Sequence, residues 1–242
     1  NCTFLSYSAP VVNFSCNACQ TELHLTAQMF NDSTDRSEKY CPICHPRETN
    51  VSKDELELLD FIKRVYSGKI ITNDRTILNG KEIDIFLPEL GIGIEYSGLY
   101  WHSENNHRHP KHASWKHKWA ATKNIRLITV FSDELHSKGD IVKSRLTHIL
   151  NGTQRRIGAR QLTIKEISYS EASHFLSENH IQGSDRSKIR IGGFFNEELV
   201  TVMTFKPTNF SKGGDGSQME LSRFAVKCFT TIAGAANRLL SH

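Results

Sequence analysis

The sequence predicts an α/β chain of the α+β type, in which helices flank a mixed β-sheet and a smaller unit lies at either end. Two observations support this prediction. Between residues 52 and 150, helix and strand patterns follow in the order α-β-β-β-α-β-α, which is typical of a mixed sheet flanked by helices. Two cysteine pairs precede this region, and a second series of helix and strand patterns follows it. We therefore expect domains at 1–46, 51–150 and 155–242.

The composition is that of a soluble globular protein, with 38% hydrophobic and 23% charged residues among 242. No apolar run approaches the roughly 20 residues that a membrane-spanning helix needs. The chain begins with Asn, and no basic segment with an apolar core follows it. We interpret this start as that of a fragment rather than a signal peptide, and we expect a cytoplasmic protein with no membrane partner.

The positive charge is concentrated in the last third of the chain. Residues 1–150 contain 18 Lys and Arg against 18 Asp and Glu, whereas residues 151–242 contain 12 against 8, which accounts for the whole net charge of +4. A basic region is compatible with a polyanionic partner such as nucleic acid. Ordinary scatter of surface charge explains these numbers equally well.

The N-terminal cysteines have the spacing of a metal site. Two residues separate Cys16 from Cys19 and Cys41 from Cys44, and 21 residues lie between the pairs. Two such turns bring four thiolates onto one tetrahedral ion, so we predict a structural Zn2+ in a small ribbon with strands at 11–16 and 22–30. The alternatives are two disulfides in a secreted protein, or His45 in place of one thiolate.

The middle region begins with an amphipathic helix. Ser52 is a good N-cap, and Glu55 stands where a capping box places its acid. Short strand patterns separated by LNGK and PELG turns follow this helix. The predicted elements are a helix over 52–66, strands over 69–74, 82–87 and 92–98, a helix over 115–124, a strand over 125–131 and a helix over 140–150.

Two of these strands carry acids at positions where a core would favour apolar residues. Period-2 alternation puts Asp84 and Glu95 opposite the apolar face, and pairing of the strands around PELG lets both face one cavity. Adjacent carboxylates repel unless a cation lies between them, so a divalent metal is expected there. Glu55 could reach the same place, and His102, seven residues after Glu95, is a candidate general base.

Simpler interpretations exist for each of these residues. Glu55 is explained by the capping box, and Asp84 by a strand edge. An isolated histidine such as His102 is often only a satisfied polar group. Lys116 and Lys118 lie on a predicted helix and are explained as solvated charges, although five histidines between 102 and 117 favour a metal or phosphate site.

The span from Glu55 to Glu134 resembles nucleases of the PD-(D/E)XK superfamily. The similarity is greatest to the branch of very-short-patch mismatch repair endonucleases and phage homing endonucleases of the EDxHD type. It depends on the helix with Glu55, on EIDIFLPELGIGIEYSGLYWH and on IRLITVFSDE. The superfamily lysine is replaced by Ser97, whereas the segment 98–102 matches a Gly-x-x-Trp-His element. Asp133 is a candidate for the last Asp of the EDxHD pattern.

The resemblance implies a restriction-endonuclease-like core that hydrolyses phosphodiester bonds of double-stranded DNA at specific sites, in the manner of a homing endonuclease. Asp84 and Glu95 would hold Mg2+, His102 would take a proton from the attacking water, and Lys116 would contact a phosphate. Cutting both strands with one site per chain would favour a homodimer. A phage-encoded enzyme of this kind acts in the cytoplasm of the host cell.

The C-terminal region is expected to be α+β. It resembles a domain found behind such nucleases in mobile elements, and also GNAT acyltransferases, of which Gly234, Ala235 and Ala236 would be a weak phosphate-binding loop. We favour DNA binding over a retained acyltransferase activity, and the remaining alternative is a non-catalytic DNA-binding protein with a decayed nuclease fold. The chain ends at His242 beside a predicted helix, which suggests that a C-terminal portion is missing. The expected elements are helices over 169–180 and 230–240, a hairpin over 189–205 and a strand over 220–226, preceded by a connector over 151–160.

Overall fold

The computed structural model describes residues 2–8, 11–26, 41–44, 51–98, 111–152, 155–208 and 218–242. The chain divides into two compact units, Asn1–Ser132 and Asp133–His242. The segment 140–150, expected as the last helix of the middle domain, therefore falls in the second unit. No helix within the described residues has both the length and the apolar character that crossing a bilayer demands.

The elements as far as the last strand of the first unit are β1 (Cys2–Ser8), β2 (Val11–Cys16), β3 (Glu22–Thr26), α2 (Lys53–Val65), β4 (Ile71–Leu78), β5 (Lys81–Leu87), β6 (Ile92–Ser97), α4 (Lys111–Thr122) and β7 (Arg126–Phe131). The chain continues with α5 (Ser132–Ser137), α6 (Gly139–Ile149), β8 (Arg155–Gly158), a 3-10 turn η2 (Ala159–Gln161), β9 (Thr163–Glu166), α7 (Tyr169–Asn179), β10 (Ile189–Phe195), β11 (Glu198–Pro207), β12 (Met219–Val226), β13 (Thr230–Ala233) and α8 (Ala235–Leu240).

The N-terminal ribbon is a three-stranded antiparallel sheet in the order β1-β2-β3. Its small core consists of Val12, Phe14, Cys16, Leu23 and Cys41. The sequence predicts the second and third strands but not β1. All of β1 after Cys2 is exposed, including Phe4 at 60%, so this edge strand has no alternation of apolar and polar residues to reveal it.

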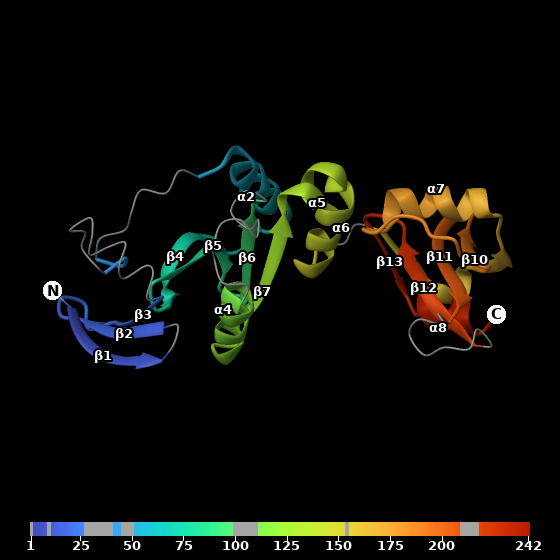
Figure 1. The fold of residues 1–242 in the computed structure, drawn as a ribbon. Helices are drawn as coiled ribbons and strands as arrows, with labels where there is room; N and C mark the ends of the chain where they lie inside the picture. Colours follow the sequence, from blue (N-terminus) through green and yellow to red (C-terminus); the bar gives the residue numbers. More distant parts are fainter. Residues whose placement is uncertain are drawn as a thin grey trace. The chain divides into compact units, whose positions relative to one another are not determined.

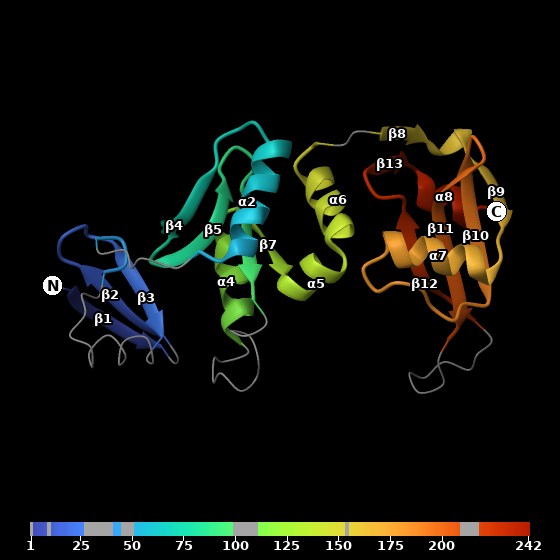
Figure 2. The same ribbon diagram turned by 90° about the horizontal axis from the view of Figure 1, so that it is seen from above.

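The central sheet has the order β4-β5-β6-β7, with α2 and α4 packed against it (Figures 1 and 2). The first three strands are antiparallel, whereas β6 and β7 are parallel because α4 lies in the crossover between them. The hydroxyl of Ser52 accepts a hydrogen bond from the backbone N–H of Glu55, as expected of the N-cap. Leu58, Phe61 and Ile62 form the buried face of α2. The predicted mixed sheet flanked by helices is thus confirmed.

The second unit contains a four-stranded antiparallel sheet in the order β12-β11-β10-β9 and a parallel pair of β13 with β8. Helix α7 covers one face of the four-stranded sheet and packs on Val202 and Ala225 (Figure 2). Helix α8 packs through Leu239 with Val200 and Met203. The expected hairpin is present as β10 and β11, and it turns at Asn196 and Glu197, which both have positive φ.

The prediction of a helix over 230–240 is wrong in its first half. Thr230–Ala233 form β13 and only Ala235–Leu240 are helical. The β-branched residues Thr230, Thr231 and Ile232 favour a strand, and Gly234, with φ of 82°, separates it from the helix. The connector over 151–160 likewise contains β8, which forms only through its parallel pairing with β13.

Candidate functional site

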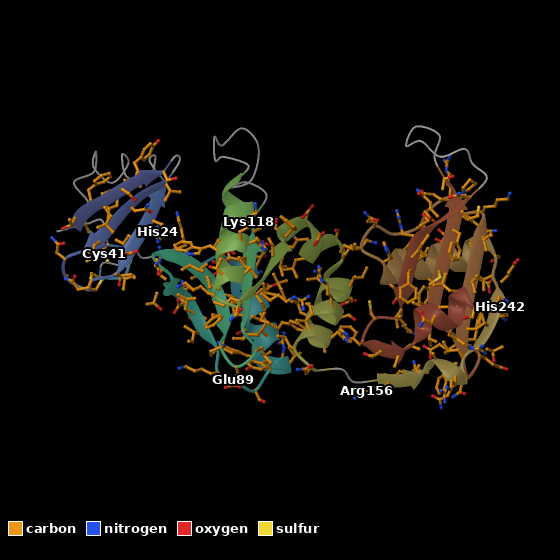
Figure 3. The ribbon with its side chains drawn as sticks, turned by 90° about the horizontal axis from the view of Figure 1, so that it is seen from below. His24, Cys41, Glu89, Lys118, Arg156 and His242 are labelled. Carbon is orange, nitrogen blue, oxygen red and sulfur yellow. The ribbon has the colours of Figure 1, made fainter. Side chains whose placement is uncertain are left out.

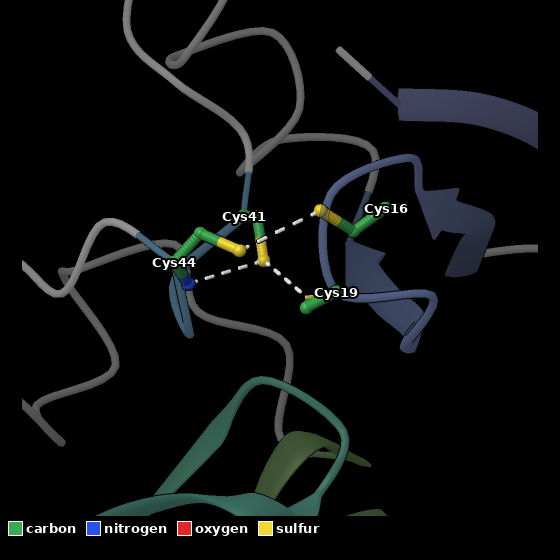
Figure 4. A group of neighbouring side chains, drawn as sticks. All are labelled: Cys16, Cys19, Cys41 and Cys44. Carbon is green, nitrogen blue, oxygen red and sulfur yellow. Dashed lines mark hydrogen bonds between the residues drawn. The ribbon is translucent and has the colours of Figure 1, made fainter.

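The four paired cysteines converge at the end of the ribbon (Figure 4). Their sulfur atoms all lie within 4.8 Å of one another, close enough to hold one metal ion. The Sγ atoms of Cys16 and Cys44 are 3.8 Å apart and those of Cys19 and Cys41 are 3.7 Å apart. These separations exceed a disulfide bond of about 2.05 Å, and all six cysteines are free. The structure therefore favours a metal site over the alternative of two disulfides.

Local hydrogen bonds lower the pKa of the Cys16 and Cys19 thiols and raise that of Cys44. The backbone N–H of Cys44 donates to the Sγ of Cys41 at 3.4 Å. Hydrogen bonds from the side chain and backbone of Thr21 lower the pKa of the Cys19 thiol to about 6. Burial raises the pKa of Cys41. Because the thiolate is the form that binds a metal, Cys19 is the best prepared of these ligands at neutral pH.

Asp84 is anchored between two strands of the central sheet. Ile85 and Ile94 are cross-strand partners and are both fully buried, so the residues beside them, Asp84 and Glu95, alternate to the other side. The Oδ2 of Asp84 accepts a hydrogen bond of 2.8 Å from the backbone N–H of Tyr96. Burial raises the pKa of Asp84, and this hydrogen bond and the charge of Lys116 oppose the shift.

Glu95 lies between β6 and α4. Its Oε2 pairs with the Nζ of Lys116, and the two side chains are only 15% and 16% exposed. Its Oε1 is buried and has no hydrogen-bond partner among the described residues. Burial raises the pKa of Glu95 to about 7, Lys116 opposes the shift and the charge of Asp84 adds to it. Within the described ranges, Glu95 is therefore a carboxylate with one oxygen paired and the other without a partner.

Glu55 lies in the first turn of α2 and is influenced by both Ser52 and Asp84. Burial raises its pKa, the charge of Asp84 adds to the shift, and a hydrogen bond from the backbone of Ser52 opposes it. The pKa of Glu55 therefore depends on the start of α2 as well as on Asp84. Among the described residues, the four cysteines are the one group of three or more candidate ligands within 4.8 Å of one another. Glu55, Asp84 and Glu95 do not converge that closely.

Two neighbours of this acid cluster (Glu55, Asp84 and Glu95) were missed. The charge of Glu82 raises the pKa of both Glu55 and Glu95, and its carboxylate pairs with Arg75. Its position two residues before Asp84 was the signal that could have identified it. The hydroxyl of Tyr96 donates to Asp54 at 2.6 Å and thereby ties β6 to α2. No pattern in the sequence predicts this hydrogen bond between Tyr96 and Asp54.

Of the remaining candidate site residues, the structure describes Lys118 and Asp133 but not His102 or His45. His102, with the rest of the segment 99–110, lies outside the described residues, as does His45. Lys118 is exposed on α4 (Figure 3), in contrast to the paired Lys116 on the same helix. Asp133 is exposed and belongs to the second unit, where it accepts a hydrogen bond from the backbone N–H of Glu134.

We expect Glu95 to make stability depend on pH. A pKa raised from 4.5 to about 7 means that folded Glu95 binds its proton more tightly than the unfolded chain does, so stability falls as pH rises from about 4.5 to 7. In buffer without divalent ions, Glu95→Gln should remove up to about 3 kcal/mol of this pH-dependent change. Thermal unfolding at about pH 5 and pH 8 measures it, with exposed Glu57→Gln as control. An unchanged pH dependence in Glu95→Gln would contradict the expectation.

Comparisons with known proteins leave the family open. No family model matches the chain, and searches of curated proteins and of solved structures each found no match. The functional conclusion therefore depends on the residues themselves.

Proposed function

We propose that the chain is a metal-dependent, site-specific DNA endonuclease of the homing type. The observation that carries the proposal is the environment of Glu95, in which one oxygen pairs with Lys116 and the other, which is buried, has no hydrogen-bond partner among the described residues. Asp84 contributes a second half-buried carboxylate close enough to shift the pKa of Glu95. Partly buried acids with shifted pKa values beside a paired lysine are typical of active sites.

The donor set suits Mg2+, which prefers carboxylate oxygens. Asp84 and Glu95 would hold the ion. The Oε1 of Glu95, which has no hydrogen-bond partner among the described residues, would gain an interaction by binding it. When bound, Mg2+ would polarise a phosphoryl oxygen and stabilise the departing alkoxide. Lys116 would contact a DNA phosphate once its partner binds the metal, and His102 would take the proton of the attacking water, as the nuclease resemblance implies.

The cysteine cluster is proposed to hold Zn2+ rather than a catalytic metal. Four thiolates complete a tetrahedral shell and leave no position for water. The ion would therefore stabilise the ribbon, and the ribbon and the basic second unit would each contact DNA. Double-strand cleavage by one site per chain would be achieved by a homodimer.

Conversion of supercoiled plasmid to its nicked form tests the proposal. We expect nicking in Mg2+ and none when Mg2+ is omitted or chelated by EDTA. Because EDTA can also remove the zinc, zinc is measured in the same samples. The sample without Mg2+ and without EDTA shows the effect of Mg2+ alone. A protein that retains its zinc and binds DNA but never nicks it in Mg2+ would instead be the decayed nuclease. The buried Ser97 stands at the position of the superfamily lysine, and its Oγ has no hydrogen-bond partner in the part of the chain that the structure describes, which favours that candidate.

An acyltransferase-like second unit is favoured by one observation. A cavity of about 510 Å³ lies beside Gly234 and Ala235, and Cys228, Phe224 and residues of α6 also line it. Such a volume suits a small-molecule ligand. Calorimetric titration of the full chain with acetyl-CoA tests this function, and a flat titration excludes it.

A further inference from the structure

Three polar side chains form a row across the second sheet. Arg190 of β10, Thr204 of β11 and Arg223 of β12 are successive cross-strand partners. Val202 and Ala225, two residues along the neighbouring strands, pack against α7. Because alternate residues share a face, the row Arg190-Thr204-Arg223 lies on the face that α7 covers (Figure 1). We refer to it below as the arginine row.

The described part of the protein supplies acceptors for only some of the hydrogen-bond donors of the two arginines in the arginine row. The Nε atoms of Arg190 and Arg223 are buried without a hydrogen-bond partner in the part of the chain that is described. The Nη1 of Arg190 donates to the backbone oxygen of Ser187 at 2.5 Å. The Nη1 of Arg223 donates to the backbone oxygen of Ser222 at 2.8 Å. None of the ion pairs between described residues includes either arginine. Both guanidinium groups therefore keep donors for another acceptor.

The segment after α7 brings further polar groups to this row. The hydroxyl of Thr204, which is fully buried, donates to the carboxylate of Asp185 at 3.3 Å. Burial lowers the pKa of His180, the charge of Arg223 lowers it further and that of Asp185 opposes the shift. The Nδ1 of His180 accepts from the backbone N–H of Gln182 at 3.2 Å, which leaves its Nε2 as a donor. Two arginines against one carboxylate give the cluster a net positive charge.

We propose that the arginine row is a phosphate-binding site. Guanidinium forks match the spacing of phosphate oxygens, and charge-assisted bonds to an anion satisfy buried Nε–H groups that otherwise cost free energy. Both arginines are only half-buried, so each side chain keeps some surface exposed to solvent. The phosphate belongs either to a DNA backbone or to a small phosphate compound, and the site does not depend on the nuclease activity.

The first experiment uses the unmodified full chain. Inorganic phosphate should raise its melting temperature by about 2–4 °C relative to NaCl at the same ionic strength, because a ligand that binds only the folded state stabilises it. Arg190→Gln and Arg223→Gln should abolish this rise. Arg238→Gln, an exposed arginine on α8, is the matched control and should keep it. If Arg223→Gln fails to fold, Arg223→Lys retains the charge but loses the fork, and should reduce the rise.

The second experiment identifies the source of the phosphate. Binding of a short DNA duplex is measured over a series of NaCl concentrations. A backbone phosphate in the site predicts that each glutamine variant lowers the slope of log K against log [NaCl] by about 0.9. A small phosphate compound predicts an unchanged slope together with loss of the thermal effect. No phosphate-specific rise in the unmodified protein and an unchanged slope in both variants would overturn the proposal.

Discussion

Asp84→Ala is expected to reduce plasmid nicking in Mg2+ by about a thousandfold, since loss of several kcal/mol of charge stabilisation in the transition state corresponds to that factor. The Oδ2 of Asp84 accepts from the backbone N–H of Tyr96, so this carboxylate is held in place before any metal arrives. A short side chain without oxygens cannot replace it. The rate of nicking, followed on supercoiled plasmid, is the measurement.

Three controls make this prediction specific to the acid cluster. Asp60→Ala removes a carboxylate that is 68% exposed on α2 and should leave nicking unchanged. Binding of the target DNA in Ca2+ should survive in Asp84→Ala, because phosphate contacts supply most of the affinity. Thermal unfolding shows whether the variant folds. A folded Asp84→Ala variant that nicks at the normal rate would refute the assignment of Asp84 to the metal.

Alternation along β5 and β6 was enough to predict that Asp84 and Glu95 depart from the apolar pattern, because a strand has a fixed period of two. The pairing of Glu95 with Lys116 could not be predicted in the same way. Lys116 is 21 residues further on, and its reach depends on how α4 packs over the sheet. The sequence therefore identified Glu95 and Lys116 as candidate site residues but did not predict the ion pair between them.

Elements with a packed face were predicted better than those without one. Helix α2 has an N-cap and three buried apolar residues, and its bounds were close to those expected. Strand β1 has an exposed pattern and was missed, and β8 forms only because β13 lies beside it. The arginine row was equally hidden, since irregularities at Gly193 and Thr204 shift the register of both strand pairs around it.

Cys41→Ser is expected to abolish stoichiometric zinc binding and to unfold the ribbon. Structural zinc contributes roughly 10–16 kcal/mol in small zinc-binding peptides, whereas the described part of the ribbon has a core of five buried side chains to replace that contribution. Metal analysis of the purified protein measures the zinc. Limited proteolysis at low protease concentration reports on the ribbon, because its segments become accessible when it unfolds.

The matched control for that prediction is Cys2→Ser. Cys2 packs against the same small core but is not one of the four sulfurs within 4.8 Å of one another. If the zinc ion stabilises the ribbon, Cys2→Ser keeps one zinc per chain and remains resistant to protease. His45→Ala should behave in the same way, because four thiolates already complete the coordination shell. Retention of full zinc by Cys41→Ser, or its loss from His45→Ala, would mean that the ligand set is different. Loss of protease resistance in Cys2→Ser with its zinc retained would instead mean that packing, rather than the metal, limits the stability of the ribbon.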